Sequence, residues 1–502
     1  MQEGSDNESS ASNASTPRLE EPTEEQKAQS EEFKAQANKK FQENHFVDAC
    51  ALYTKAIELN PKNHILYANR AFSHIKLENY GTAITDAAEA INLDKTYIKG
   101  YYRRGTAYLA LGKLKSALAD FKSACVIEPA NKDARAKLDE CKKAIRKEQF
   151  EKAIESEQTT KKTLSPDDIQ VEPSYKGPAL ENGKVTEEFI TELIAHLKAE
   201  KRLHAKYALQ IFQQVLEVLK AEKTVVDVEV PEGEYINVCG DVHGQFYDLC
   251  NIFEKAGRPS EKNPFLFNGD FVDRGSFGVE TVLLLFAFKV LYPQHMHLNR
   301  GNHETTNMNK MYGFEGEIKA KYKEADFMPL LTDIFQWLPL AHVIGGKVLV
   351  LHGGLFSKDD VTLDQLRKID RHMEPPDEGP MTELLWSDPG PLPGRQPSKR
   401  GVGVAFGPDV AERFLKANGL DLLIRSHECK DDGYEVEHGG RTITVFSAPN
   451  YCDQMGNQGA LVRLAAPDFR PAYTQFAAVP HPAVRPMQYA GFGGGFNFAN
   501  FL

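Results

Sequence analysis

The chain lacks any uninterrupted apolar run of the length, about 20 residues, that a membrane-spanning helix needs. Its seven cysteines are an odd number, are widely scattered and include no Cys-x-x-Cys pair. This pattern excludes a disulfide framework and a thiolate zinc site, and it is typical of reduced thiols. We therefore expect a protein of the cytoplasm and nucleus.

Basic residues are also too few for a chain built to bind nucleic acid. Lysine and arginine total 60 against 71 aspartates and glutamates, which gives a net charge of −11. A hydrophobic content of 41% and a length of 502 residues predict a globular protein of more than one domain. The first 25 or so residues have hardly any large apolar side chain. We expect residues 1–29 to be disordered and to be neither a signal nor a transit peptide.

From about Ser30 the sequence repeats every 34 residues without gaps. Small residues occupy the eighth, twentieth and twenty-seventh positions of each unit, and a bulky residue occupies the seventeenth. These positions are Ala37, Ala71 and Gly105; Ala49, Ala83 and Ala117; Ala56, Ala90 and Ala124; and Phe46, Tyr80 and Leu114. Small residues let paired antiparallel helices approach closely, and this spacing resembles the tetratricopeptide (TPR) repeat. We predict an all-α TPR solenoid over residues 30–156, with a capping helix from Lys132 to about Ser156, followed by a linker at 157–184.

Five polar residues of the array share one helix face. Each lies on the first helix of its pair, at spacings that direct them into the concave groove of a solenoid: Lys34, Asn38, Asn69, Lys99 and Arg103. A solvated surface is one interpretation, and a pocket for a peptide carboxylate is the other. The five match the carboxylate clamp of TPR domains that bind the C-termini of heat-shock protein 90 and heat-shock protein 70, and the resemblance implies such a partner.

Residues 185–485 read as an α/β domain, most simply two sheets packed face to face with helices outside. Polar residues follow its short strands just where each strand ends. They are Asp241 and His243 after 235–237, Asp270 after 264–267, Asn302 after 296–299, His352 after 347–351 and His427 after 421–425. Ligands of α/β proteins bind at such strand ends, so we expect these side chains to meet in one site.

The donor types of this set indicate a metal site. Carboxylates, an amide oxygen and imidazoles without thiolates suit Mn, Fe or Zn, with Mg as a further candidate. Asp270 stands in the middle of the set, so we predict that it bridges two ions. Two ions would activate a shared water molecule and neutralise phosphate oxygens. No Cys-x5-Arg loop is present, which favours water over a cysteine nucleophile.

Phosphate hydrolysis also needs an acid and fixed cations. His303 directly follows Asn302, and Asp273 is expected to fix its orientation and raise its pKa. Arg274 and Arg400 are the candidate phosphate-binding cations. His-Gly-Gly occurs a second time at His438, but it lies between two alternating runs and predicts a hairpin turn.

These motifs together resemble the PPP-type metallophosphatases. Three signature blocks stand at Gly240–Gly244, Gly269–Gly275 and Gly301–Glu304. The rest of the eukaryotic serine/threonine set stands at His352–Gly354, Lys399–Val402, Arg425–Glu428 and Ser447–Cys452. The resemblance implies hydrolysis of phosphoserine and phosphothreonine in one step, without a phosphoenzyme.

The same resemblance assigns roles to residues of this chain. It implies that Asp241, His243 and Asp270 hold one metal, and that Asp270, Asn302, His352 and His427 hold the other. It implies that His303 and Asp273 form the acid pair and that Tyr451 lies on the substrate side. The phosphate contacts that it implies are Arg274, Asn302, His303 and Arg400.

Fusion of TPR repeats to such an enzyme implies control of access. In this family resemblance the TPR domain covers the active site at rest, and groove ligands such as chaperone tails or fatty acids release it. The Gly/Phe-rich tail at 486–502 departs from the short C-terminal helix of the relatives with this domain order. We expect a monomer that binds phosphoproteins and no nucleic acid. Two alternatives are an adaptor with an inert phosphatase domain and a metallophosphoesterase acting on nucleotides.

Overall fold

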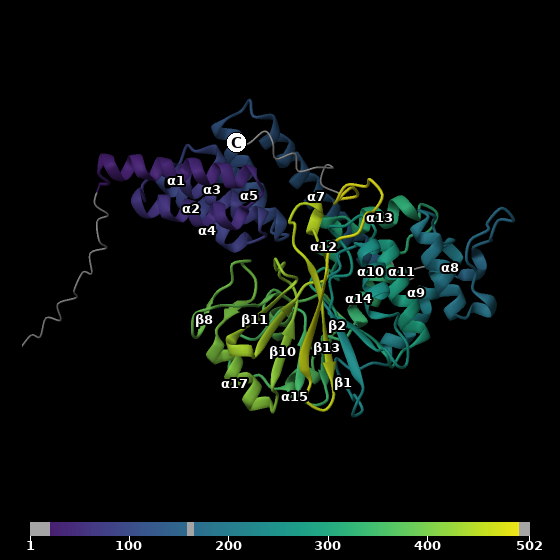
Figure 1. The fold of residues 1–502 in the computed structure, drawn as a ribbon. Coiled ribbons are helices and arrows are strands. Elements are labelled where there is room, and N and C mark those ends of the chain that lie inside the picture. The colour runs from purple at the N-terminus through teal and green to yellow at the C-terminus, as the bar shows by residue number, and fades with distance from the viewer. Residues whose placement is uncertain (1–20, 158–164, 491–502) are drawn as a thin grey trace, which may run out of the picture.

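The computed structural model describes residues 21–157 and 165–490. An all-α array precedes an α/β region, and the array lies over one end of the strands of that region (Figure 1). Within the described ranges, no helix combines the length and the apolar character needed to cross a membrane.

The array consists of three antiparallel helix pairs and a closing helix. They are α1 (Glu24–Gln42), α2 (Phe46–Leu59), α3 (His64–Lys76), α4 (Tyr80–Leu93), α5 (Ile98–Ala110), α6 (Leu114–Ile127) and α7 (Lys132–Glu157). The small residues Ala37, Ala49, Ala71 and Ala83 are fully buried, which confirms that the repeat positions are helix contacts. The TPR prediction and its capping helix are therefore confirmed.

The predicted start of this array is wrong by several residues. Helix α1 begins at Glu24, inside the segment 1–29 that we expected to be disordered. Thr23 and Gln26 form a capping box, in which each side chain accepts a hydrogen bond from the other residue's backbone N–H. This local signal places the helix start ahead of the first small repeat position. Residues 1–20 of that segment lie outside the described part of the chain.

Two sheets form the predicted sandwich. The six-stranded sheet contains, in order, β1 (Val225–Val228), β5 (Ala341–Ile344), β6 (Val348–Leu351), β10 (Leu422–Arg425), β12 (Thr442–Val445) and β11 (Tyr434–Glu437). The five-stranded sheet contains β14 (Arg470–Phe476), β13 (Gly459–Ala465), β2 (Tyr235–Cys239), β3 (Phe265–Phe267) and β4 (Met296–Leu298). Apolar side chains of both sheets, among them Val238, Leu266, Val350 and Ile424, pack between them in one core.

Helices cover the outer faces of both sheets. Those against the five-stranded sheet or its loops are α8 (Glu187–Lys198), α9 (Ala205–Lys220), α10 (Phe246–Ala256), α11 (Gly278–Leu291), α12 (Thr306–Tyr312), α13 (Phe314–Lys321) and α14 (Met328–Trp337). Those on the other side are α15 (Leu363–Arg367), α16 (Pro380–Trp386) and α17 (Pro408–Asn418). This confirms the predicted α/β fold class. A third small sheet of β7 (Asp388–Pro389), β9 (Val404–Phe406) and β8 (Arg395–Pro397) was not predicted.

The segments between and after the domains are partly ordered. The predicted linker contains the short 3-10 helices η1 (Pro166–Asp168) and η2 (Glu181–Gly183), and residues 158–164 lie outside the described chain. His438 lies in the turn η3 (His438–Gly440) that joins β11 to β12, which pair antiparallel, so the predicted hairpin is confirmed. A further 3-10 turn is η4 (Tyr451–Asp453). The predicted tail 486–502 is described as far as Ala490.

Candidate active site

The strand ends that carry the predicted ligands converge at one edge of the sandwich. Strands β2, β3 and β4 run parallel to one another, and β6 runs parallel to β10 in the other sheet. An isolated bridge between Asp241 and Phe446 joins the edges of the two sheets. The six predicted ligands are therefore neighbours, and all are buried: Asp241, His243, Asp270, Asn302, His352 and His427.

Asp270 is shared between two groups of donors, as predicted for a bridging carboxylate. One group combines it with His243 and His303, and the other with His352 and His427. Its Oδ2 lies 3.5 Å from His243 Nε2 and 3.4 Å from His352 Nε2. Asp241 lies beside both groups, because its carboxylate oxygens are 3.8 Å from His243 Nε2 and 3.7 Å from His352 Nδ1.

Backbone carbonyls orient two of the imidazoles. His243 Nδ1 lies 3.1 Å from the Val272 carbonyl oxygen, and His352 Nδ1 lies 2.8 Å from that of Asn268. With the proton on Nδ1, the Nε2 atom of each ring offers its lone pair to the site. Burial lowers the pKa of His243 to about 3, so this ring is in the neutral form that binds metals.

The site fits cations, because it gathers acceptor atoms and has few donors to pair with them; the one ring nitrogen near His352 Nε2 is His427 Nδ1, at 3.2 Å. His352 Nε2 lies 2.8 Å from Asn302 Oδ1, so two acceptor atoms face each other. His427 Nε2 is buried without a hydrogen-bond partner among the described residues. Burial also raises the pKa of Asp241 to about 8 and that of Asp270 to about 7. Bound cations remove all three penalties.

Close backbone packing holds the ligand loops together. A Cβ atom on Gly301 would come within 2.2 Å of Asp270 Oδ1, so glycine is required there. The carboxylate of Glu304 accepts hydrogen bonds from the backbone N–H groups of Asp270, Phe271 and Gly301, at 2.7–2.9 Å. Glu304 therefore ties the second ligand loop to the third.

The two residues predicted to form the acid pair, His303 and Asp273, are in contact. His303 Nδ1 lies 2.9 Å from Asp273 Oδ2, and Asp273 is held by the side chain of Asn309 and the N–H of Phe314. The expected orientation is confirmed, but the expected rise in the pKa of His303 is wrong. Burial lowers its pKa well below the ordinary value, and the nearby His243 and Arg274 lower it further. Burial also raises the pKa of Asp273, so its charge does not compensate.

Both predicted phosphate-binding arginines reach the site. Arg400 is held by Asp388, which lies 2.7 Å from its Nε, and it donates from Nη2 to the His427 carbonyl oxygen at 2.6 Å. The guanidinium carbon of Arg274 lies 3.8 Å from the centroid of the Tyr312 ring. The ring of Tyr451 packs 5.1 Å from that of His243.

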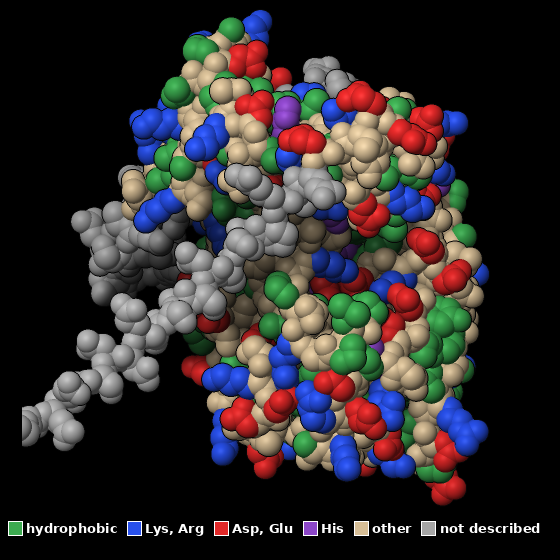
Figure 2. Space-filling view, turned by 90° about the vertical axis from the view of Figure 1, so that its left-hand side faces the viewer, with side chains coloured by type: hydrophobic (Ala, Val, Ile, Leu, Met, Phe, Trp, Pro, Cys, Tyr) green, Lys and Arg blue, Asp and Glu red, His purple; other side chains and the backbone are tan. Residues whose placement is uncertain are grey.

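A residue from the TPR array also enters the site. Glu78, in the turn between α3 and α4, forms an ion pair of 2.7 Å with Arg274 Nη2. The Thr82 N–H donates to the Lys399 carbonyl oxygen at 3.0 Å. A cavity of about 220 Å³ lies between the two regions, and its walls include both Glu78 and the ligand Asp270. Figure 2 shows a recess between the upper and lower halves of this face, with acidic and basic side chains beside it.

Glu78 and Asp388 are functional candidates that the sequence patterns did not identify. Glu78 lies in the turn between α3 and α4, and no repeat or motif pattern marks an acidic residue there. Asp388 begins a strand of the small sheet that was not predicted. Glu304 is the last residue of the third signature block, so its position was noted in the sequence, but no role was predicted for it.

The five residues that we predicted to form a carboxylate clamp lie on α1, α3 and α5. Arg103 donates from Nη1 to Asn69 Oδ1 at 3.2 Å, and Asn69 Nδ2 lies 3.4 Å from Asn38 Oδ1. Tyr53 also donates to Asn38 Oδ1, at 2.6 Å. Lys34 lies 2.5 Å from Glu31, and the pKa of Lys99 is lowered by burial and by Arg103. All five residues thus lie on the first helices of their pairs, as the repeat predicts.

Comparison with known families covers both regions. Residues 235–431 match the calcineurin-like phosphoesterase family, residues 52–85 and 98–131 match tetratricopeptide repeats, and residues 138–227 match the PPP5 TPR repeat region. The chain is 55% identical to serine/threonine-protein phosphatase 5 of Homo sapiens, over 95% of this chain and 96% of the relative. The chain belongs to the serine/threonine-protein phosphatase 5 family.

Other relatives agree with this assignment. The enzyme of the same name from Arabidopsis thaliana is 52% identical, over 92% of this chain and 97% of that protein. A solved Saccharomyces cerevisiae phosphatase described as similar to human phosphatase PP5 matches with a TM-score of 0.58 and 43% identity. It covers 61% of this chain and 100% of the solved chain.

The protein is therefore a metal-dependent protein serine/threonine phosphatase with an N-terminal TPR region. Family membership implies two divalent metal ions, and the buried histidine and aspartate groups can hold metal. The match along nearly the whole chain favours this activity over the inert-adaptor and nucleotide-hydrolase alternatives.

Proposed function

We propose that Asp241, His243 and Asp270 hold one ion, and that Asp270, Asn302, His352 and His427 hold the other. The donor set of oxygen and nitrogen atoms without thiolates supports ions of the Mn, Fe or Zn type. When bound, the two ions supply an activated water molecule and charge neutralisation at the phosphate.

Side chains of this protein bind the phosphate and supply the proton for the leaving oxygen. Arg274 and Arg400 bind the phosphate oxygens, and neighbouring contacts restrict both guanidinium groups. Asp273 holds His303 by Nδ1. The doubly charged phosphate that binds beside His303 favours the protonated ring and offsets the effect of burial on its pKa, so Nε2 delivers the proton to the serine or threonine oxygen as it leaves.

We further propose that the TPR array inhibits the enzyme at rest. The observation that carries this proposal is the ion pair of Glu78 with Arg274. A carboxylate on Arg274 occupies the donors that a phosphate would use. Glu78 and the neighbouring Lys76, Leu77, Asn79 and Tyr80 all line the cavity that contains the metal ligands, so substrate and array compete for the same space.

Replacement of this carboxylate tests the inhibition. Glu78→Gln keeps the size of the side chain but removes the charge paired with Arg274, and we expect basal activity on a small aryl phosphate to rise about tenfold. The matched control is Glu58→Gln, which removes the same charge from an exposed position on α2. Unchanged or reduced activity of Glu78→Gln would count against inhibition through this contact.

We propose that the TPR groove binds the acidic C-terminus of heat-shock protein 90 or heat-shock protein 70. The hydrogen-bonded series from Arg103 through Asn69 to Asn38 supports this assignment, because it orients the amide groups before a ligand arrives. Lys34 and Lys99 add positive charge to the same face. A carboxylate is the ligand that such a set recognises.

Carboxylate recognition by the groove can be tested on the full chain by measuring its affinity for a fluorescent peptide that ends in acidic residues. Lys99→Ala is expected to weaken binding about tenfold, because it removes a cation from a partly buried anion site. Lys115→Ala makes the same change at an exposed position on α6 and should leave the affinity unchanged. Equal affinity for a peptide with an amidated C-terminus would exclude carboxylate recognition.

Fatty acids are a second proposed class of activating ligand. A cavity of about 430 Å³ lies between the array and the catalytic region, and apolar side chains such as Phe46, Leu109 and Met311 line it together with Lys76 and Arg485. An apolar chain with one carboxylate suits this lining, and its entry would separate the two regions.

A further inference from the structure

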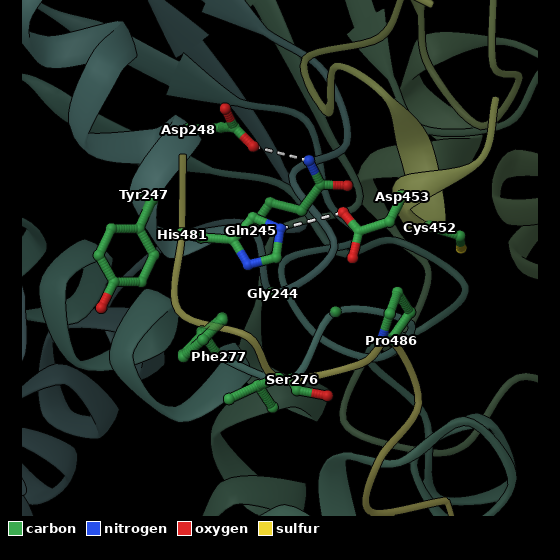
Figure 3. Close-up of a pocket in the computed structure, with 12 residues that line it drawn as sticks. Gly244, Gln245, Tyr247, Asp248, Ser276, Phe277, Cys452, Asp453, His481 and Pro486 are labelled. Carbon is green, nitrogen blue, oxygen red and sulfur yellow. Dashed lines mark hydrogen bonds and ion pairs between the residues drawn. The ribbon is translucent and has the colours of Figure 1, made fainter. Parts of the chain in front are cut away.

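A C-terminal strap, which we define as residues 477–490, crosses the loops of the active site after β14 ends. It lies beside α12 and α13 at the end of the sandwich that faces the TPR array (Figure 1). The strap touches the loop that carries Arg274. Figure 3 shows a small pocket beside this contact. His481 and Pro486 of the strap line it together with Ser276 and Phe277 of the loop.

The loop under the strap has an unfavourable backbone conformation. Asp273 and Arg274 are consecutive and both have a φ of 67°. An ordinary L-residue is strained in this left-handed region. Such residues persist where the surroundings hold them, and they are common at functional sites. Arg274 therefore needs contacts that fix its main chain as well as its side chain.

The strap provides these contacts through Met487 and Ser276. The Met487 N–H donates to the Arg274 carbonyl oxygen at 2.8 Å, and its sulfur lies 3.8 Å from Arg274 Nη1. The Ser276 hydroxyl donates to the Arg485 carbonyl oxygen at 2.7 Å and accepts from the Gln488 N–H at 3.3 Å. One buried hydroxyl thus links the strap to the loop on both sides of Met487.

Contacts within the catalytic region anchor the strap. The Val479 N–H donates to Asp248 Oδ1 at 2.9 Å. His481 Nε2 lies 3.0 Å from Asp453 Oδ1, as Figure 3 shows. At its other end, a Cβ atom on Gly316 of α13 would come within 2.0 Å of the Tyr489 carbonyl oxygen, so the two backbones are in direct contact. The strap is a fixed support for the loop.

We propose that Ser276 and Met487 are positioning residues that hold Arg274 in the orientation that binds phosphate. This inference rests on the proposed role of Arg274 as a phosphate contact. Neither residue touches substrate in this scheme. Met487 contacts both the main chain and the guanidinium group of Arg274, and Ser276 holds the strap on both sides of Met487, so the expected defect is in phosphate binding.

The test uses the full chain in a Glu78→Gln background, so that the Glu78 carboxylate does not compete with phosphate. Ser276→Ala removes both hydrogen bonds of the hydroxyl. We expect the KM for a phosphopeptide and the inhibition constant of inorganic phosphate to rise together, each about tenfold. Ser276→Thr retains the hydroxyl and should restore both constants. Gln488→Ala keeps the backbone donor, changes an exposed side chain and should have no effect.

A second pair of variants makes the same test without altering the loop. Ending the chain after Pro482 removes Met487 and should reproduce the defect of Ser276→Ala, whereas ending it after Ala490 should not. A fall in kcat with unchanged KM and phosphate inhibition would show a merely structural role and overturn the proposal.

Arg274→Ala distinguishes phosphate binding by Arg274 from the positioning of Arg274 by Ser276 and Met487. If it does not weaken inhibition by phosphate, the proposed role of Arg274 fails. If it does weaken inhibition while Ser276→Ala and the Pro482 truncation do not, the positioning role alone fails.

Discussion

Replacing Asp270 with asparagine is expected to lower kcat/KM by about 10³-fold or more. Two divalent ions supply several kcal/mol of transition-state stabilisation, and each 1.36 kcal/mol is about tenfold in rate. Asp270 is the donor common to both groups of metal-binding side chains. Its neutral amide cannot bridge two cations, so both ions should be lost or weakened together.

Metal binding and heat stability check this expectation independently of activity. Cations that bind the folded state stabilise it, so added Mn²⁺ should raise the melting temperature of the unsubstituted protein. In Asp270→Asn this increase should disappear, and metal analysis should find less than one ion per chain. Asp421→Asn, at an exposed position before β10, is the matched control. Retention of two tightly bound ions by Asp270→Asn would refute the bridging role.

His303→Ala should lower kcat by about 10²–10⁴-fold on phosphoserine peptides, the usual contribution of a positioned acid. The loss should be much smaller on an aryl phosphate with an acidic phenol as its leaving group. Such a phenolate departs without a proton, whereas a serine alkoxide requires one. The ratio between the two substrates therefore measures the acid role itself.

The alternative role of His303 is that of a ligand, because it lies in a group with His243 and Asp270 whose donor atoms approach within 4.8 Å of one another. If it were a ligand, His303→Ala would lose metal and would lose activity equally on both substrates. If it is the acid, the variant retains two ions. His295→Ala, at a partly exposed position before β4, should change neither the metal content nor the substrate ratio.

Features that recur along the sequence, or that stand at strand ends, were predictable. The TPR helices follow from small residues every 34 positions, because each such residue lies at a helix contact that is repeated along the solenoid. The metal ligands follow from strand ends, because parallel strands bring their carboxyl ends to the same edge. Asp270 stood in the centre of that series in the sequence, and it lies between the two donor groups in space.

Other features depend on packing and were not predictable from local patterns. Helix α1 starts at Glu24 because of a capping box, which the repeat register did not include. The pKa of His303 falls because the ring is buried beside His243 and Arg274, and the whole fold sets both the burial and these neighbours. The hold of Asp388 on Arg400 requires a small sheet whose strands have two or three residues each.

By itself, the sequence determined the chemistry: which residues supply oxygen and nitrogen donors, where strands end, and that a TPR solenoid precedes the catalytic region. The tertiary structure decided how Arg274 is used. Glu78, from a turn far earlier in the chain, and Met487, from the strap near its end, meet at this one guanidinium group. Both contacts depend on how distant segments of the chain pack together, and no local sequence pattern around Glu78 or Met487 predicts them.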